Sequence, residues 1–210
     1  MKGAFITFEG CEGSGKSTQI RLMADFLRAR GAEVIITREP GGTPLAERIR
    51  GLLMETSGET IAPLTELFLY EAARAQHVQQ VVLPALQRGA IVLCDRFYDS
   101  TTVYQGVGRK LDPATVGLLN RLAAGAVRPM HTYVFDLPAA EGLRRAWERG
   151  SDDRMMQEAV TFHEAVREGF LALAQEEGDR ITIVDASRPI EIIQEELRRH
   201  ICGLPFMENR

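Results

Sequence analysis

The sequence lacks several features that define whole classes of protein. Its three cysteines, Cys11, Cys94 and Cys202, follow no metal-binding spacing and form an odd set, so we expect reduced thiols and a cytoplasmic location. No apolar run approaches the roughly 18 residues that a membrane span requires, which predicts no association with a membrane. A strand-like pattern begins within the first residues, so we also expect no cleaved signal segment.

Lysine is scarce, because it occurs only at Lys2, Lys16 and Lys110, and arginine supplies the remaining positive charge. The formal net charge of −4 argues against a protein that coats nucleic acid, and we expect no nucleic-acid partner. Arginine is suited to planar, two-point contacts with phosphate. A compositional bias of the genome explains the same excess, so both interpretations stay open.

The sequence does contain a regular alternation of short apolar runs and amphipathic stretches, without repeats, low-complexity segments or linkers. Its 210 residues suit one α/β domain, which we take as residues 1–210. Strands separated by helices indicate a parallel sheet with helices on both faces. We therefore predict a three-layer α/β fold with a five-stranded parallel sheet, whose strands are residues 4–9, 34–37, 90–95, 133–137 and 181–185.

Helical periodicity and helix-boundary residues predict the elements between these strands. Gly31 ends the first helix, and Pro44 and Pro113 each stand at a helix start, where proline is well tolerated. The polar segment that follows Asp95 is expected to be irregular. The other expected helices are residues 16–30, 63–87, 157–177 and 190–201, with one from 139 to the polar segment at 149, and residues 203–210 are expected to fray.

A glycine-rich motif lies between the first expected strand and the first helix. Residues 10–17, GCEGSGKS, match the pattern G-x-x-x-x-G-K-[ST] in the strand–loop–helix context that the motif requires, which indicates a P-loop NTPase fold. Glycines let backbone N–H groups turn toward phosphate oxygens, and the helix N-terminus adds positive potential. Lys16 would reach the β- and γ-phosphates of ATP, and Ser17 would ligate Mg²⁺. The expected ATP-binding residues are Gly10, Cys11, Glu12, Gly13, Ser14, Gly15, Lys16, Ser17 and Thr18.

Two residues near this motif have competing interpretations. Asp95 ends the third expected strand, at the edge where open sheets bind ligands, and would hold the hydration shell of Mg²⁺. A capping aspartate at a strand end is the alternative. Cys11 suggests redox chemistry, although a tolerated small side chain explains it more simply. The motif alone leaves the phosphoryl acceptor open, because GTPases, ATP-driven motors and small-molecule kinases share it.

Four segments resemble motifs of the thymidylate kinase family, which are P-loop nucleoside monophosphate kinases. The segments are DRFYDST at 95–101 with YQG at 104–106, REPGGT at 38–43, a loop with Glu12 and no arginine as in the bacterial type, and a lid at about 149–157. The resemblance extends from the first strand to the last helix. It implies that a homodimer transfers the γ-phosphoryl group of MgATP to dTMP, giving dTDP and ADP, in dTTP biosynthesis.

The resemblance also implies roles for individual residues. Arg96 and Arg50 would clamp the acceptor phosphate, Glu12 would lie near the sugar 3′-hydroxyl, and Arg149 and Arg154 would spread charge on the transferred phosphoryl group. The implied catalytic residues are Lys16, Glu12, Arg96, Arg149 and Arg154, with Ser17 and Asp95 at the metal. The implied dTMP-binding residues are Glu12, Pro40, Arg50, Tyr70, Arg74, Arg96, Ser100, Thr101, Tyr104 and Gln105.

Tyr70 and Arg74 are four residues apart, so one helix face presents both. The resemblance implies that thymine stacks on Tyr70, where relatives usually have phenylalanine. It also implies that Arg74 donates a hydrogen bond to a carbonyl of the base. From the residues alone, the favoured interpretations are a core aromatic for Tyr70 and a solvated helix charge for Arg74. Arg50 is likewise explained as a cation at a helix C-terminus, and Gln105 as a loop residue without a partner.

The lid segment departs from the family pattern, because Met155-Met156 stand where relatives often have glutamate soon after the lid arginine. A solvated turn between helices, and a family member that binds nucleotides without catalysis, are the alternatives here. A nucleoside kinase would not need Arg50 and Arg96 on an acceptor phosphate. A GTPase-type switch would need an N-K-x-D motif, which the sequence lacks.

Overall fold

The computed structural model describes residues 3–56, 59–150 and 153–207. Five parallel strands form one sheet in the order β2-β3-β1-β4-β5. The predicted five-stranded parallel sheet is confirmed, with strand ends shifted by at most two residues. The strands are β1 (Ala4–Gly10), β2 (Val34–Arg38), β3 (Ile91–Asp95), β4 (His131–Asp136) and β5 (Ile181–Asp185).

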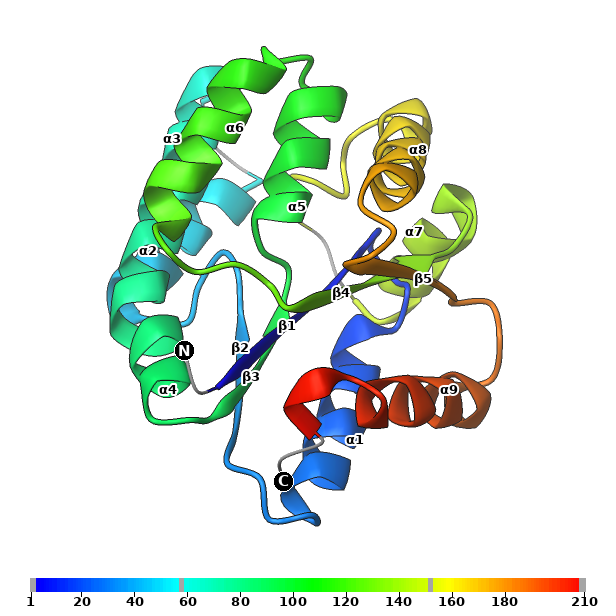
Figure 1. Ribbon diagram of the computed structural model, residues 1–210. Helices are drawn as coiled ribbons and strands as arrows, with labels where there is room; N and C mark the ends of the chain where they lie inside the picture. The colour runs from blue at the N-terminus through cyan, green and yellow to red at the C-terminus, as the bar shows by residue number, and fades with distance from the viewer. Residues whose placement is uncertain (1–2, 57–58, 151–152, 208–210) are drawn as a thin grey trace.

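Helices cover both faces of the sheet (Figure 1). On one face α1 packs beside α9, and on the other α4, α5 and α8 contact the strands directly. Helices α2, α3 and α6 pack against one another beyond them. The helices are α1 (Lys16–Arg28), α2 (Pro44–Met54), α3 (Pro63–His77), α4 (Leu83–Gln87), α5 (Tyr98–Thr101), α6 (Pro113–Ala124), α7 (Ala139–Glu148), α8 (Val160–Glu176) and α9 (Ile190–Cys202).

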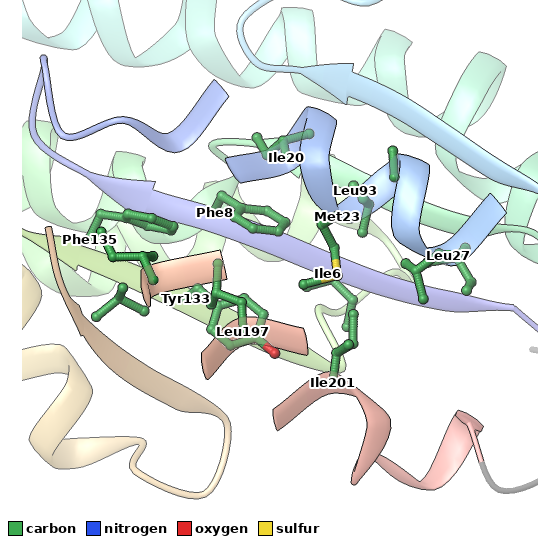
Figure 2. Packing of buried hydrophobic residues seen from close by; sticks show 14 of the residues in the cluster. Ile6, Phe8, Ile20, Met23, Leu27, Leu93, Tyr133, Phe135, Leu197 and Ile201 are labelled. Carbon is green, nitrogen blue, oxygen red and sulfur yellow. The ribbon is translucent and has the colours of Figure 1, made fainter. Parts of the chain in front are cut away.

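The largest core lies between the sheet and helices α1 and α9 (Figure 2). Ile6 and Phe8 of β1 meet Ile20, Met23 and Leu27 of α1, and all five side chains are buried. The helical residues recur at the spacing of one helix face, which explains why this stretch folds as an amphipathic helix. Burying each such side chain contributes roughly 1.5–3 kcal/mol. This packing fixes the start of α1 against the end of β1.

The long helical stretch predicted over residues 63–87 is divided rather than continuous. A π-helical turn, Val78–Val82, separates α3 from α4. Pro84 lies at the start of α4 and has no backbone N–H for the α-helical hydrogen bond. A local widening of the helix accommodates that missing donor. The periodicity therefore predicted that this stretch is helical, but it did not predict the π-helical turn within it.

The prediction of an irregular segment after Asp95 is wrong. Residues 98–101 form α5, and a π-helix, Thr102–Gly108, continues from it. The segment is polar because Thr101 and Gln105, both 1% exposed, hydrogen-bond to buried charged side chains. Its polarity thus reflects buried partners rather than contact with solvent.

The C-terminal segment is more ordered than predicted. Pro205–Met207 form a 3₁₀ turn, and Leu204, Phe206 and Met207 pack against the core below the sheet. The prediction that residues 203–210 fray is therefore wrong for residues 203–207. Residues 208–210 lie outside the described residues. Among the described helices, none is long and apolar enough to cross a membrane.

Candidate active site

A cleft of about 490 Å³ opens where β1, β2 and β3 end. It collects nearly all of the residues predicted for the site, apart from Gly10, Cys11 and Arg154, which do not line it. The predicted residues on its wall are Glu12, Gly13, Ser14, Gly15, Lys16, Ser17, Thr18, Pro40, Arg50, Tyr70, Arg74, Asp95, Arg96, Ser100, Thr101, Tyr104, Gln105 and Arg149.

The glycine-rich loop between β1 and α1 adopts a conformation that only glycine allows at two positions. Gly10 has φ 121°, and a Cβ there would lie 2.4 Å from the oxygen of Phe135. Gly13 has φ 73°, and a Cβ there would lie 1.9 Å from the oxygen of Gly142. The loop therefore passes so close to β4 and α7 that a side chain would not fit at either position. Its shape is set by the fold before any ligand binds.

Lys16 is held inside the loop. Its Nζ donates to the backbone oxygens of Gly10 at 2.9 Å and Cys11 at 2.8 Å. Burial, and then the nearby charge of Arg96, lower the pKa of Lys16. The loop therefore presents an ammonium group whose bonds to backbone oxygens can be exchanged for bonds to phosphate oxygens.

Ser17 and Asp95 meet beside this loop, as predicted for a metal-holding pair. The Ser17 hydroxyl donates to Oδ2 of Asp95 at 2.7 Å. Hydroxyl and carboxylate oxygens are ligands that suit Mg²⁺. Across the described residues no group of three or more histidine, cysteine or acidic side chains could hold a metal. The pair thus fits a cation that takes its other ligands from phosphate and water.

Arg96 joins the loop to the end of β3. Its backbone has φ 69°, which is uncommon outside glycine, and its N–H donates to Phe8 at 3.0 Å. Its Nη2 donates to Glu12 at 2.6 Å, and the Tyr104 hydroxyl donates to both Glu12 oxygens at 2.9 Å. Burial opposes ionisation of Glu12 most strongly, but Arg96 together with His163 and Lys16 outweighs burial and holds the pKa of Glu12 well below its usual range. A fixed charge pair therefore faces the cleft.

Glu9 is linked to Arg96 through hydrogen bonds to the residues that follow Arg96 in the chain. It is fully buried and accepts hydrogen bonds from the Phe97 N–H and the Ser100 hydroxyl, both at 2.6 Å. Ser100 in turn accepts from Nη1 of Arg96 at 3.1 Å. Burial, and then the neighbouring Asp99, raise the pKa of Glu9 to about 8. Glu9 thus fixes the turn that carries Arg96.

Arg74 is buried in the wall of the cleft, with only 2% of its surface exposed. Its Nε donates to Glu39 at 2.8 Å and its Nη1 to Glu71 at 2.6 Å. Nη1 also donates to Asn120 at 3.0 Å, and Nη2 to Thr101 at 2.8 Å. Burial disfavours the charge, but Glu39 and Glu71 outweigh it and raise the pKa of Arg74. A solvated helix charge is excluded, and one of the five N–H donors remains free of these bonds.

Other predicted acceptor residues line the same cleft as Arg74. Tyr70 is half-buried on the cleft wall, so it is not an ordinary core aromatic. Arg50 donates to the backbone oxygen of Pro40 at 3.1 Å, which brings both to the cleft. Gln105 donates to Glu66 at 2.7 Å, so it does not lack a partner.

The two predicted lid arginines take different positions. Arg149 is exposed and lines the cleft beside the glycine-rich loop. Arg154 instead contacts Glu66 and the backbone oxygen of Leu53. The middle of the predicted lid, residues 151–152, lies outside the described residues.

Sequence reasoning missed the buried acidic residues that organise the cleft. Glu39 pairs with both Arg74 and His77, and Glu66 is completely buried. A signal for part of this set was present. Residues 66, 70, 74 and 77 follow helical spacing, so one face of α3 carries Glu66, Tyr70, Arg74 and His77.

His163 on α8 was also missed. Its ring is buried, and Nδ1 lies 3.5 Å from Oε2 of Glu12. Neither ring nitrogen has a hydrogen-bond partner among the described residues. Its backbone oxygen accepts from the Cys11 thiol at 3.8 Å. Burial, and then Glu12, raise the pKa of Cys11 to about 12, which favours the small structural side chain over redox chemistry.

Comparisons with known proteins show which sequences and which fold this chain resembles. Residues 8–197 match a family model described as thymidylate kinase. A thymidylate kinase of Geobacter sulfurreducens is 51% identical over 195 residues, which cover 90% of this chain and 92% of the relative. One of Pseudomonas fluorescens is 53% identical over 197 residues, or 94% of each chain. The crystal structure of thymidylate kinase from Ehrlichia chaffeensis superposes with a TM-score of 0.77, at 32% identity, over 96% of this chain and 99% of that one.

The raised pKa of Glu9 predicts a pH dependence of stability. The unfolded chain releases this proton near the ordinary pKa of 4.5 and the folded chain keeps it to about 8, so folding is favoured less and less as pH rises through that window. We expect Glu9→Gln to remove this slope, so that wild type loses a few kcal/mol relative to the variant between about pH 4.5 and 8.

Urea unfolding at several pH values measures this difference. Glu195→Gln, at an exposed site on α9, is the matched control and should follow wild type. Parallel curves for wild type and Glu9→Gln would contradict the prediction.

Proposed function

The chain belongs to the thymidylate kinase family, and we propose on that premise that its cleft transfers the γ-phosphoryl group of MgATP to dTMP, giving dTDP and ADP, in dTTP biosynthesis. It is an ATP-dependent nucleoside monophosphate kinase, a transferase. One observation carries the proposal. The glycine-rich loop with Lys16 and the arginines Arg50 and Arg96 line the same cleft, so a donor and an acceptor phosphate have adjacent cationic sites.

The donor half of the site binds ATP through residues 10–18. Backbone N–H groups of the loop and the N-terminus of α1 hold the phosphate chain, and Lys16 turns from loop oxygens to the β- and γ-phosphates. Ser17 and Asp95 hold Mg²⁺ and its waters. When bound, the ion neutralises charge on the phosphate oxygens.

The acceptor half holds the dTMP phosphate between Arg50 and Arg96. Two guanidinium groups offset a dianion and fix its line of attack. Glu12 is already ionised, and it accepts a hydrogen bond from the sugar 3′-hydroxyl in place of one from Tyr104. Ser100 completes this edge through its bond to Arg96.

The thymine base lies between Tyr70 and the π-helix at residues 102–108. The Tyr70 ring stacks on the base, and the remaining N–H of Arg74 donates to a base carbonyl. Thr101, Gln105 and Pro40 border the base. Because Arg74 is fixed by four bonds, its last donor is preorganised, and little ordering is needed on binding.

Transfer is direct and in line, because the two halves of the cleft align donor and acceptor. No covalent enzyme intermediate is needed, since positioning and charge neutralisation supply most of the rate enhancement. Arg149, on the exposed rim of the cleft, moves onto the transferred group and stabilises charge on its equatorial oxygens. The segment of about 149–157 acts as the lid of a single kinase domain.

We further propose that the protein is a cytoplasmic homodimer. Large apolar side chains are exposed on α2, α3 and α6, which pack against one another. These helices lie together on one side of the molecule (Figure 1). A second copy of the chain would cover this patch, whose residues are Leu52, Leu64, Phe68, Leu118 and Leu122.

The first test of function is coupled ADP release with MgATP and a panel of dTMP, dUMP, thymidine, CMP and AMP. We expect fast turnover with dTMP and little with thymidine, because the two arginines recognise the acceptor phosphate. Preferred turnover of another acceptor would overturn the base site, and no turnover with any acceptor would overturn the kinase assignment.

The separation of donor and acceptor sites predicts distinct effects of substitutions at two residues. Lys16→Ala should lower transfer by more than about a hundredfold, because it removes a donor to the transferred phosphate. Arg96→Ala and Arg96→Lys should lower kcat/KM for dTMP strongly, while ATP still binds to the loop. Steady-state kinetics and equilibrium ATP binding measure both, with Arg199→Ala on α9 as an exposed control. Wild-type turnover in either Arg96 variant would remove Arg96 from the site.

The dimer is tested by charge on the apolar patch. Leu122 is 68% exposed, so Leu122→Arg should be tolerated by the monomer and should repel a second copy. We expect light scattering to report a dimer for wild type and a monomer for the variant. Trp147→Arg alters an equally exposed apolar residue outside the patch and should stay dimeric. A monomeric wild type would refute the assembly.

A further inference from the structure

Arg154 makes a set of contacts that a ligand of the donor phosphates would not make. Its Nη2 donates to Glu66 at 2.6 Å, its Nε to the Leu53 oxygen at 2.9 Å, and its backbone N–H to the Met54 oxygen at 3.3 Å. The end of α2 and the start of α3 thus hold this residue from both sides. Neither helix belongs to the donor loop, and Arg154 does not line the cleft.

Glu66 is the common partner of three donors. Its side chain is 0% exposed, and it accepts from Gln105 at 2.7 Å, from Arg109 at 3.1 Å and from Arg154 at 2.6 Å. Burial alone would raise the pKa of Glu66, but its bonds to Arg109 and Gln105 outweigh burial and lower that pKa. A buried carboxylate is destabilising without such partners, so Glu66 constrains all three donors.

The residues after Arg154 form part of the cleft. Met155 and Met156 are buried, and both line the cleft. Met155 also packs in a cluster with Tyr104. Fixing Arg154 therefore fixes an apolar wall of the acceptor half. The two methionines, which depart from the family pattern, have a packing role here.

We infer that Arg154 is a positioning residue for the acceptor site, anchored by Glu66, and that it does not contact the donor phosphates. The inference rests on the proposed function, because it assumes that dTMP occupies this half of the cleft. Glu66 orients Gln105 at the base edge and, through Arg154, the wall formed by Met155 and Met156. Occupation of the base site and placement of this wall therefore depend on one buried carboxylate.

The two lid arginines then have separate roles. Arg149 remains exposed on the wall of the cleft and supplies charge to the transferred group. A role for Arg154 at the phosphates would require it to give up its bonds to Glu66 and Leu53, leaving Glu66 with one cation fewer. A hydrogen bond to a charged group stabilises more than one between neutral groups, so the loss of these bonds opposes that movement.

The experiment measures dTMP binding and turnover in matched variants. We expect Arg154→Ala to weaken dTMP binding by calorimetry, and to raise KM for dTMP, by roughly tenfold or more, since that corresponds to one charged hydrogen bond. KM for ATP and kcat should change by less than about threefold. Arg154→Lys should recover part of the loss. Arg149→Ala should show the opposite pattern, a fall in kcat with little change in KM for dTMP.

The link through Glu66 is tested by a double-mutant cycle. Glu66→Gln keeps the shape of the side chain and should show the same rise in KM for dTMP, and adding Arg154→Ala should have little further effect. Arg144→Ala should match wild type, because this exposed arginine of α7 pairs, within the part of the chain that the structure describes, with Glu141 and Glu148.

Several results would overturn the inference. If Arg154→Ala lowers kcat and leaves dTMP binding unchanged, Arg154 acts at the phosphates. Additive effects of the two substitutions would exclude action through Glu66. If Glu66→Gln fails to fold, the split between KM and kcat in Arg154→Ala and Arg154→Lys still decides. If the wild-type protein binds no dTMP, the proposed function is refuted as well. If wild type and Arg154→Ala both bind dTMP, and equally tightly, only the inference is refuted.

Discussion

The ion pair between Arg96 and Glu12 joins the loop after β1 to the segment after β3, and the shape of the acceptor site depends on it. Arg96 adopts a left-handed backbone that few side chains tolerate, and bonds to Glu12, Ser100 and Phe8 compensate for that strain. With this pair in place, the guanidinium faces the cleft, the carboxylate is ionised, and Tyr104 closes one side. In the proposed reaction this pair belongs to the acceptor half, directly beside the loop that binds the donor phosphates.

The same principle applies in the wall of the cleft, where two buried carboxylates have donors from distant segments. Glu39 holds Arg74 and His77, and Glu66 holds Gln105, Arg109 and Arg154. Such groups add little net stability compared with apolar packing, but removing one partner is strongly destabilising. They therefore fix geometry rather than add stability. The apolar core between the sheet and α1 supplies the stability that this arrangement requires.

Local patterns in the sequence predicted the parallel sheet, the glycine-rich loop and the position of Asp95 at the end of a strand, because spacing along strands and helices determines them. The π-helix after α5 was predicted to be irregular, since its polar residues resemble those of a loop when their buried partners are unknown. The bond between Glu66 and Arg154 joins residues 88 positions apart, and no local period encodes it. Glu66, Tyr70 and Arg74 do share one helix face, so their common orientation was available from the sequence.

The contrast between Arg149 and Arg154 shows why a motif assigns charge to a region more reliably than to an atom. Both arginines lie in the segment that resembles a lid, and either could reach the phosphates on the basis of sequence distance. Burial decides between them. Glu66 is wholly enclosed and must keep its cations, whereas Arg149 is exposed and free to move onto a newly formed charge. A cation already neutralised by a buried carboxylate has less to gain from the transition state, so its charge serves to hold the acceptor wall in place.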